Sequence, residues 1–305
     1  MSYDVVVIGA GAGGEAAAGA SAKLGSKVAV VERDLFGGLC AFWACLPSKT
    51  LLDAAGRRAL GAGYPWERAS ARRDWMINRE RIGYPDDAGH VRSLESDGAE
   101  VIRGTARLIG RSRIEVRSEG AALRTLETRS VILAVGSRPV VPQIDGLHAA
   151  GFWTSNDGTA TRDLPSSIAI LGGGVVGVEL AQVFARFGVR TTIIQGSDRI
   201  LPRDHPKSSG VVADQLRAEG VDIRTDVTAR SVERGGAGRR LTLSDESLVE
   251  AAELMVAVGR RAADLGELGS EDAGVSLDDR GHASPDERMA VADGVFVAGD
   301  CAGGP

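Results

Sequence analysis

The chain has 305 residues, 43% apolar, 25% charged and only 4% aromatic, which suits one large domain or two ordinary ones and excludes a disordered or fibrous protein. Its formal charge of -5 does not indicate a basic surface of the kind that binds nucleic acid or anionic lipid. No apolar run approaches the roughly 18 residues of a membrane span, and the N-terminus lacks the order of a signal peptide. The sequence therefore predicts a cytoplasmic protein without nucleic-acid or membrane partners.

The first predicted elements are a strand, a glycine turn, a helix and a second strand. The first strand covers residues 4–8, DVVVI, a continuous apolar run typical of a parallel strand buried on both faces. It leads into GAGAGG at residues 9–14, which fits G-x-G-x-x-G, and the alanine-rich stretch 15–24 is expected to be helical. A strand at 28–31 then ends at Glu32, whose carboxylate can accept hydrogen bonds from a ribose. This order predicts a dinucleotide-binding unit.

The glycines of this turn have separate tasks in such a unit. Gly9 allows the tight turn, Gly11 lets the backbone approach a pyrophosphate, and Gly14 lets the helix pack against the strand. The helix N-terminus that follows faces the phosphates. We therefore predict that Gly9, Gly11, Gly13 and Gly14 bind a cofactor.

Two of the three cysteines come next, in the segment GGLCAFWACLPSK at residues 37–49. Three cysteines are too few for a disulfide scaffold, and in a reducing cytosol a close pair such as Cys40 and Cys45 is typical of catalysis, redox sensing or metal binding. A zinc site would need two more ligands, and neither Cys301 nor the four histidines stand at metal-ligand spacing. No metal is predicted, and Pro47 is consistent with a helix that starts near it.

Residues 61–100 form a polar stretch that carries Trp66, Trp75 and two arginine pairs. This pattern favours a helical insertion with a solvated surface over a role in binding a substrate. Cys301 is expected to be a small packed residue.

A second copy of the nucleotide-binding unit follows in the later half of the chain. A strand at 168–171 precedes GGGVVG at 172–177, and a helix is expected over 178–187. The next strand, at 191–194, ends at Gln195. One G-x-G-x-x-G match is weak evidence because glycine is abundant, but the repetition makes the prediction strong.

The two copies share the same spacing from the first glycine to the polar acceptor. Glu32 follows Gly9 by 23 residues, and Gln195 follows Gly172 by the same 23. Glu32 suits an unphosphorylated ribose, as in FAD or NAD, whereas Gln195 can bind a ribose hydroxyl without repelling a 2′-phosphate. The residues predicted to hold the second nucleotide are Gly172, Gly174, Gly177 and Gln195.

The cysteine segment, read as G-G-x-C-x4-C-x-P-S-K, resembles the pyridine nucleotide-disulfide oxidoreductases, the family of dihydrolipoamide dehydrogenase, glutathione reductase and mercuric reductase. Four further segments, at 104–106, 128–139, 256–260 and 295–300, are similar to flavin- and nicotinamide-contacting parts of that family. The resemblance implies additional cofactor contacts at Gly38, Lys49, Ala106, Gly136, Gly259, Arg260 and Asp300. The AFWA between the cysteines departs from the family's Leu-Asn-Val-Gly, which leaves the substrate open.

The resemblance also implies an architecture. We expect an α/β protein with two Rossmann-like three-layer nucleotide-binding domains. Residues 1–147 would form the first part of an FAD-binding domain, residues 148–264 an NAD(P)-binding domain, and residues 265–305 the return to the FAD-binding domain.

The chemistry implied by the resemblance passes two electrons from NAD(P)H through FAD to a disulfide formed by Cys40 and Cys45. Cys45 would lie against the flavin and Cys40 would exchange with the substrate, a small-molecule or protein-borne disulfide or dithiol. Lys49 and Glu179 occupy the positions of the family's lysine–glutamate pair near flavin N5. Gly196 stands where glutathione reductase has its first 2′-phosphate arginine, which favours NAD. The expected function is that of a dihydrolipoamide dehydrogenase-like enzyme.

Two other interpretations stay open. A low-molecular-weight thioredoxin reductase fits the length, but that group carries C-x-x-C in its nicotinamide domain and residues 148–264 contain no cysteine. A non-catalytic FAD- or NAD-binding protein is the second. The chain ends just after the segment 295–300, where the family continues with a domain that forms homodimers and carries a His-Glu pair. A truncated and impaired form is therefore expected.

Overall fold

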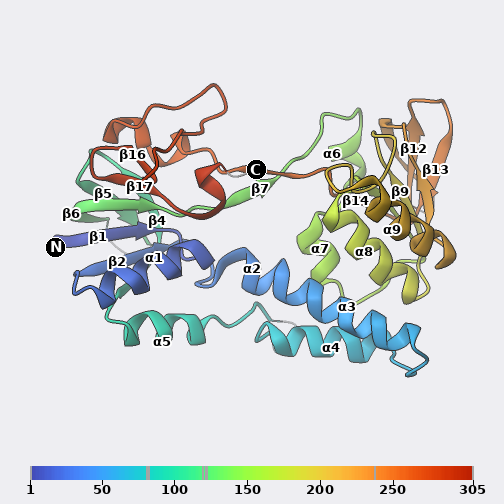
Figure 1. Cartoon of the computed structure of the whole chain (residues 1–305), viewed down its shortest axis with the longest axis horizontal. Coiled ribbons are helices and arrows are strands. Elements are labelled where there is room, and N and C mark those ends of the chain that lie inside the picture. The colour runs from blue at the N-terminus through green and yellow to red at the C-terminus, as the bar shows by residue number, and fades with distance from the viewer. Residues whose placement is uncertain (1, 80–82, 119, 121–122, 237, 304–305) are drawn as a thin grey trace. The chain divides into compact units, whose positions relative to one another are not determined.

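The computed structural model describes residues 2–79, 83–118, 120, 123–236 and 238–303, and it is a mixed α/β protein (Figure 1). The chain divides into two compact units. The first unit comprises Met1–Phe42, Asn78–Arg138 and Arg261–Pro305, and the second comprises Trp43–Ile77 and Pro139–Arg260. The fold class predicted from the sequence is confirmed.

The first unit is built on an eight-stranded sheet. Its main path runs β16-β17-β6-β1-β2-β3, with β4 and β5 continuing from β6. The pairs β1–β2, β1–β6, β6–β17 and β2–β3 are parallel. The strands are β1 (Ser2–Ile8), β2 (Val28–Glu32), β3 (Glu100–Arg103), β4 (Thr105–Leu108), β5 (Arg113–Arg117), β6 (Arg124–Leu133), β16 (Ala290–Ala292) and β17 (Val295–Val297). The helical segments are α1 (Ala12–Lys23), α2 (Gly38–Phe42), α5 (Ala88–Ser96), η1 (Gly266–Leu268), η2 (Ser270–Ala273) and η3 (Gly299–Ala302).

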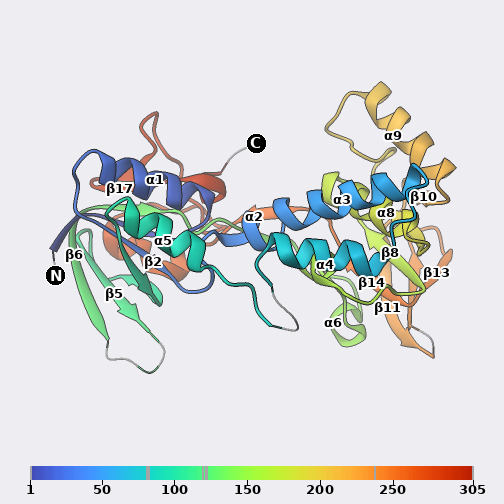
Figure 2. The ribbon, with the colours of Figure 1, turned by 90° about the horizontal axis from the view of Figure 1, so that it is seen from below.

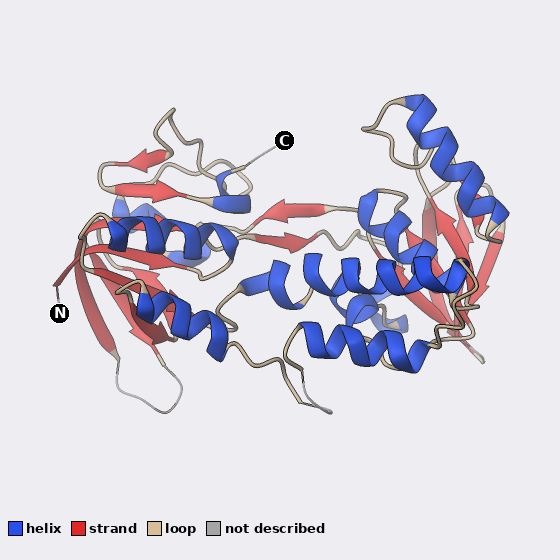
Figure 3. Cartoon of the chain, turned by 60° about the horizontal axis from the view of Figure 1, so that its bottom comes forward, coloured by secondary structure: helices blue, strands red, loops and turns tan. Residues whose placement is uncertain are grey.

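Both faces of this sheet are buried, as the continuous apolar run of β1 predicts. Val6 and Ile8 enter one core with β4, β5 and β17, while Val7 enters a second core with residues of α1 and α5. Helices α1 and α5 therefore cover one face of the sheet (Figure 3). The alternation follows from the two-residue period of a strand.

The second unit contains a four-stranded parallel sheet of order β10-β9-β8-β14 and a three-stranded antiparallel sheet of order β11-β12-β13. Its strands are β8 (Ser167–Leu171), β9 (Arg190–Ile194), β10 (Asp222–Arg224), β11 (Ala229–Gly235), β12 (Gly238–Leu243), β13 (Leu248–Ala251) and β14 (Glu253–Val256). Its helices are α3 (Cys45–Ala59), α4 (Trp66–Met76), α6 (Leu147–Ala150), α7 (Ser155–Ala160), α8 (Val175–Arg186) and α9 (Pro206–Ala218). Two short strands, β7 (Ser137–Pro139) and β15 (Arg260–Ala262), pair with one another at the chain's passages between the units.

Helix α3 packs within the second unit between α4 and α8 (Figures 1 and 2). Leu51 and Ala55 of α3 share an apolar cluster with Trp66 of α4 and Val183 of α8. For this reason residues 43–77 group with the second unit, although the sequence-based ranges place them in an FAD-binding domain that extends to residue 147. The assignment of ranges to cofactors stays a prediction.

The insertion between residues 61 and 100 is helical, but its α4 is not merely a solvated surface helix. Arg73 is fully buried and Trp66 is 7% exposed, whereas Trp75 points outward at 67% exposure. The prediction of a solvated surface was therefore wrong for the inner face of α4, where the buried Arg73 pairs with its neighbour Asp74 and donates to carbonyls that lie far away in the sequence. No helix of the described residues has the length and apolarity needed to cross a membrane.

Candidate active site

The first glycine turn has a geometry that only glycine tolerates at two of its positions. Gly9 has φ +99°, a conformation that side chains disfavour. A Cβ on Gly14 would lie 1.9 Å from the carbonyl oxygen of Gly9, so α1 packs directly against the end of β1. A Cβ on Gly11 would meet no atom within 4 Å, which leaves the N-terminal side of α1 open to a ligand.

Glu32 closes this turn from the end of β2. Its Oε2 accepts the backbone N–H of Ala10 at 2.8 Å and its Oε1 accepts that of Asp34 at 2.8 Å. A carboxylate offers about four acceptor positions, so Glu32 keeps capacity for ribose hydroxyls. An open helix N-terminus beside a fixed carboxylate fits the pyrophosphate and ribose of a dinucleotide.

The second turn repeats the first almost atom for atom. Gly172 has φ +105°, and a Cβ on Gly177 would lie 2.0 Å from the Gly172 oxygen. A Cβ on Gly174 would again meet nothing within 4 Å. Gln195 accepts the N–H of Gly173 through Oε1 at 2.7 Å, the same contact that Glu32 makes with Ala10. The match in sequence spacing thus reflects a match in hydrogen bonding.

The glycines before Cys40 bring the cysteine segment against the first turn. Gly37 and Gly38 have φ +104° and +63°, and Gly37 forms an isolated bridge with Gly11. A Cβ on Gly38 would lie 2.7 Å from the Cα of Gly11, and a Cβ on Gly37 would lie 2.7 Å from the ring of His90. A larger residue at either position would collide with these neighbours and displace the segment from the first turn.

His90 is a neighbour of this segment that sequence reasoning missed. Its Nδ1 lies 2.8 Å from Oε1 of Glu15, and its ring meets that of Phe42 edge-on with 5.5 Å between centroids. Burial raises the pKa of Glu15, and the neighbouring His90 opposes that rise. The two partners are 75 residues apart in the chain, and no sequence pattern connects them.

Cys40 and Cys45 are both exposed. Cys40 lies on α2 of the first unit, and Cys45 is the first residue of α3 in the second unit. The N-terminus of α3 has no side-chain cap, so its unpaired N–H groups and its dipole favour an anion there. Such an end suits a thiolate, the form of cysteine that exchanges with disulfides.

Lys49 and Glu179 form an ion pair within the second unit. Lys49 Nζ lies 2.7 and 2.6 Å from the two carboxylate oxygens of Glu179. Lys49 stands four residues after Cys45, which places both on one face of α3. The lysine side chain is 61% exposed, so the pair adds about 1 kcal/mol or less to stability. The pair therefore matters less for stability than for the positive charge that Lys49 places on the face of α3 that carries Cys45.

The segment near residue 300 adjoins the first turn. Asp300 Oδ2 accepts the Ser137 hydroxyl at 2.5 Å, and a Cβ on Gly13 would lie 3.1 Å from the Gly299 nitrogen. Gly136, next to Ser137, has φ +72°. Gly13, Gly136 and Asp300 are thus gathered in one region of the first unit. Ala106 instead places its side chain in the core, and Gly259 and Arg260 lie in the second unit.

Cys301 is buried and differs in character from the other two cysteines. It is 1% exposed, and its Sγ donates to the Leu133 carbonyl at 3.1 Å. The expectation of a packed residue is confirmed. Among the described residues, no group of three or more His, Cys, Asp or Glu side chains is placed to hold a metal ion.

Burial raises the pKa of the Cys301 thiol, which gives a testable outcome. A raised pKa keeps the thiol protonated near neutral pH, so Cys301 is expected to react with a thiol reagent only after unfolding. The variant with both Cys40 and Cys45 replaced by serine should therefore show no fast reaction in the native state. Fast labelling of that double variant would contradict the burial seen here.

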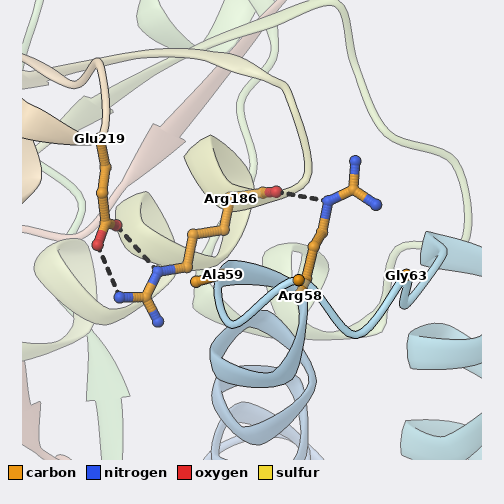
Figure 4. Close-up of a pocket in the computed structure, with 6 residues that line it drawn as sticks. Arg58, Ala59, Gly63, Arg186 and Glu219 are labelled. Carbon is orange, nitrogen blue, oxygen red and sulfur yellow. Dashed lines mark hydrogen bonds and ion pairs between the residues drawn. The ribbon is translucent and has the colours of Figure 1, made fainter.

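A shallow hollow lies at the opposite end of α3 from Cys45 (Figure 4). Arg58 Nε donates to the Arg186 carbonyl at 2.7 Å, and Arg186 in turn forms two hydrogen bonds with Glu219 at 3.0 and 2.7 Å. A helix rises 1.5 Å per residue, so Arg58 lies about 20 Å along α3 from Cys45. These hydrogen bonds hold the C-terminus of α3 in place. The hollow is therefore separate from the cysteine segment.

The chain belongs to the pyridine nucleotide-disulphide oxidoreductase family, whose model matches residues 3–305. Members of this family bind FAD and use NAD(P)H. The resemblance inferred from the cysteine segment is thereby confirmed.

Individual relatives narrow the comparison. The chain is 34% identical to a mercuric reductase of Streptomyces lividans, covering 98% of this chain and 65% of the relative. It is 31% identical to a dihydrolipoyl dehydrogenase of Bacillus subtilis, covering 100% and 67%. The HOCl-induced flavoprotein disulfide reductase RclA from Escherichia coli matches in structure with a TM-score of 0.89 and 29% identity, over 99% of this chain and 67% of that one. The chain thus spans about two thirds of the length of these relatives.

Proposed function

We propose that this chain is the cofactor-binding part of a flavin-dependent disulfide oxidoreductase in which Cys40 and Cys45 form the redox-active disulfide. The observation that carries the proposal is the seating of the cysteine segment on the first glycine turn, where Gly38 packs against Gly11 with no room for a side chain. That contact supports a place for Cys40, two residues after Gly38, beside the proposed dinucleotide-binding turn. In the balanced reaction, NAD(P)H gives a hydride, a proton joins it, and a disulfide takes up two electrons and two protons to become two thiols.

Different residues would bind the cofactor and carry out the thiol chemistry. Gly9, Gly11, Gly14 and Glu32 would hold the pyrophosphate and ribose of FAD, and Asp300 would contact its ribityl chain. FAD, when bound, supplies the exchange of electrons between nicotinamide and thiol.

The remaining site residues act on thiols and protons. Cys45 would lie nearer the flavin and Cys40 would attack the substrate disulfide. Lys49, held by Glu179, would place a positive charge on the face of α3 that carries Cys45.

The nicotinamide site is proposed for the second turn, with Gly172, Gly174, Gly177 and Gln195. Gln195 already uses its oxygen to accept the Gly173 N–H, so its amide N–H groups are the donors left for a ribose. A donor tolerates either a hydroxyl or a 2′-phosphate, while Gly196 supplies no arginine for the phosphate. We propose NAD as the preferred nucleotide, with NADP accepted less well.

Gln195→Glu is expected to sharpen this preference. A carboxylate would repel a 2′-phosphate, so NADPH-dependent flavin reduction should fall about tenfold or more, which corresponds to roughly 1.4 kcal/mol. NADH-dependent reduction should stay within about threefold of the original rate. Stopped-flow reduction of the bound flavin by each nucleotide measures both. Equal losses with NADH and NADPH would show that Gln195 does not face the ribose 2′ position.

The proposal also covers the substrate, the cellular location and the oligomeric state. A dihydrolipoamide-like or protein-borne disulfide is the expected substrate, and thiol exchange of this kind fits the reducing cytoplasm. Homodimers are proposed for the whole protein. A low-molecular-weight thioredoxin reductase is disfavoured because residues 148–264 contain no cysteine.

The test is an anaerobic titration with NADH and NADPH of the chain loaded with FAD, followed by trapping of thiols. We expect the Cys40 and Cys45 thiols to appear together as the nucleotide is consumed, because they share one disulfide. Trapped thiols are identified by peptide mapping. If the flavin is reduced while both cysteines keep the reactivity they had before, the chain is a flavoprotein without a redox disulfide and the proposal fails.

A further inference from the structure

A buried arginine in α4 organises one region of the second unit. Arg73 is fully buried, its Nε donates to Asp74 Oδ1 at 2.8 Å, and its terminal nitrogens donate to the carbonyls of Thr159 and Thr161, the latter at 3.0 Å. Asp74 Oδ2 also accepts from Arg162 at 2.8 Å. Removing one partner would leave a buried charge uncompensated, which is strongly destabilising, so the cluster holds these residues in place.

Arg73 acts as a cap for the short helix α7. Thr159 and Thr161 lie at the C-terminal end of α7, where backbone carbonyls have no partner within the helix. The guanidinium satisfies two of these carbonyls and its positive charge suits the negative end of a helix. The insertion therefore fixes α7, an element more than eighty residues away in the chain.

Helix α7 in turn reaches the start of the cysteine helix. Thr159 is 2% exposed. Its hydroxyl lies 2.9 Å from the Trp43 carbonyl oxygen and 3.1 Å from that of Asn156. Trp43 stands two residues before Cys45. Since α3 begins at Cys45 without a side-chain cap, this hydrogen bond is a tether for the peptide that leads into the helix.

We propose that Thr159, supported by Arg73, is a positioning residue for Cys45. The inference rests on the proposed redox role of the cysteine pair. Because Trp43 is tethered, the end of the segment 41–44 next to Cys45 is fixed. When reduction increases the sulfur–sulfur distance, Cys40 therefore moves and Cys45 does not. A fixed Cys45 raises the effective concentration of one thiol at the other and so stabilises the disulfide.

The experiment compares Thr159→Val with Thr159→Ser in the FAD-loaded chain. Valine keeps the size of threonine and loses the hydroxyl, whereas serine keeps the hydroxyl. Thr191→Val is the matched control, because Thr191 is 1% exposed and its hydroxyl donates to the Val189 carbonyl at 2.9 Å in the same unit. The readout is the ratio of reduced glutathione squared to oxidised glutathione at which half of the Cys40–Cys45 pair is reduced, measured by trapping and mass spectrometry.

We expect Thr159→Val to lower that ratio at least fivefold, so that the pair is reduced more easily, while Thr159→Ser and Thr191→Val stay within twofold of the original chain. An unchanged ratio in Thr159→Val, or an equal shift in Thr191→Val, would overturn the proposal. If Thr159→Val does not fold, Thr159→Ala takes its place in the same comparison. Failure of the proposed function shows separately, because the unaltered chain would then have no reducible pair.

Discussion

Serine in place of Cys40 or Cys45 is expected to reduce disulfide-reductase turnover at least about 1,000-fold, as for loss of a nucleophile in other enzymes. A hydroxyl cannot form or exchange a disulfide, so neither variant can pass electrons from flavin to substrate. Reduction of the flavin by NADH should persist in both, because no cysteine is among the residues proposed to hold the nucleotides. Turnover with a disulfide substrate and the rate of flavin reduction, measured on the same samples, check the two halves of this expectation.

Spectroscopy separates the roles of the two thiols. If Cys45 lies against the flavin, the reduced chain should show a long-wavelength absorption band from its thiolate, and Cys45→Ser should abolish that band. Cys40→Ser should retain it, since the remaining thiol is the one beside the flavin. Loss of the band in Cys40→Ser with retention in Cys45→Ser would mean that the roles are reversed.

Alanine at Gly14 or Gly177 is the second substitution with a large expected effect. The new Cβ would lie 1.9 or 2.0 Å from a backbone oxygen of the same turn, so the helix must move away from the strand it packs against. Overpacking of this kind costs about 3 kcal/mol or more. Gly14→Ala is expected to lose FAD together with much of its stability, and Gly177→Ala to lose NADH-dependent flavin reduction while a chemical reductant still works.

The neighbouring glycines provide the controls. Gly11→Ala meets no protein atom within 4 Å, so it should keep its thermal stability without ligand and lose only affinity for FAD. Gly56→Ala, which also has open space around it within α3, should affect neither. Differential scanning calorimetry and flavin content measure the two effects. Equal stability losses at Gly11 and Gly14 would contradict the packing described for the turn.

The two glycine turns could be predicted because strand, turn and helix follow one another in the sequence. Gly14 and Gly177 contact Gly9 and Gly172 of their own turns, whereas a Cβ on Gly9 or Gly172 would also meet distant residues, Ala134 and Ala257, that the pattern does not reveal. The predicted helix after the first turn begins at residue 15, whereas α1 begins at Ala12, because a glycine-rich first turn of a helix carries no propensity signal. The pairing of Lys49 with Glu179, by contrast, came from the family resemblance.

The supports of the cysteine segment could not be predicted, because they join distant parts of the chain. His90 meets Glu15 across 75 residues, and Arg73 meets Thr159 across 86. A polar sequence with paired arginines usually indicates a solvated helix. Here one of those arginines is buried because the Asp74 carboxylate beside it and carbonyls from the end of α7 replace its water. Single-sequence patterns do not encode the distant carbonyls.

The interleaving of the two units also bears on how the chain folds as it is made. Translation delivers residues in order, at roughly 5–20 per second, yet the second unit needs both Trp43–Ile77 and Pro139–Arg260, and the first needs Arg261–Pro305. Strand β1 is made first, but its partner β6 ends at Leu133 and β17, which pairs with β6, ends at Val297. The edge of β6 that β17 covers therefore stays unpaired in the nascent chain until residue 297 has been made, and until then it is open to pairing with other chains.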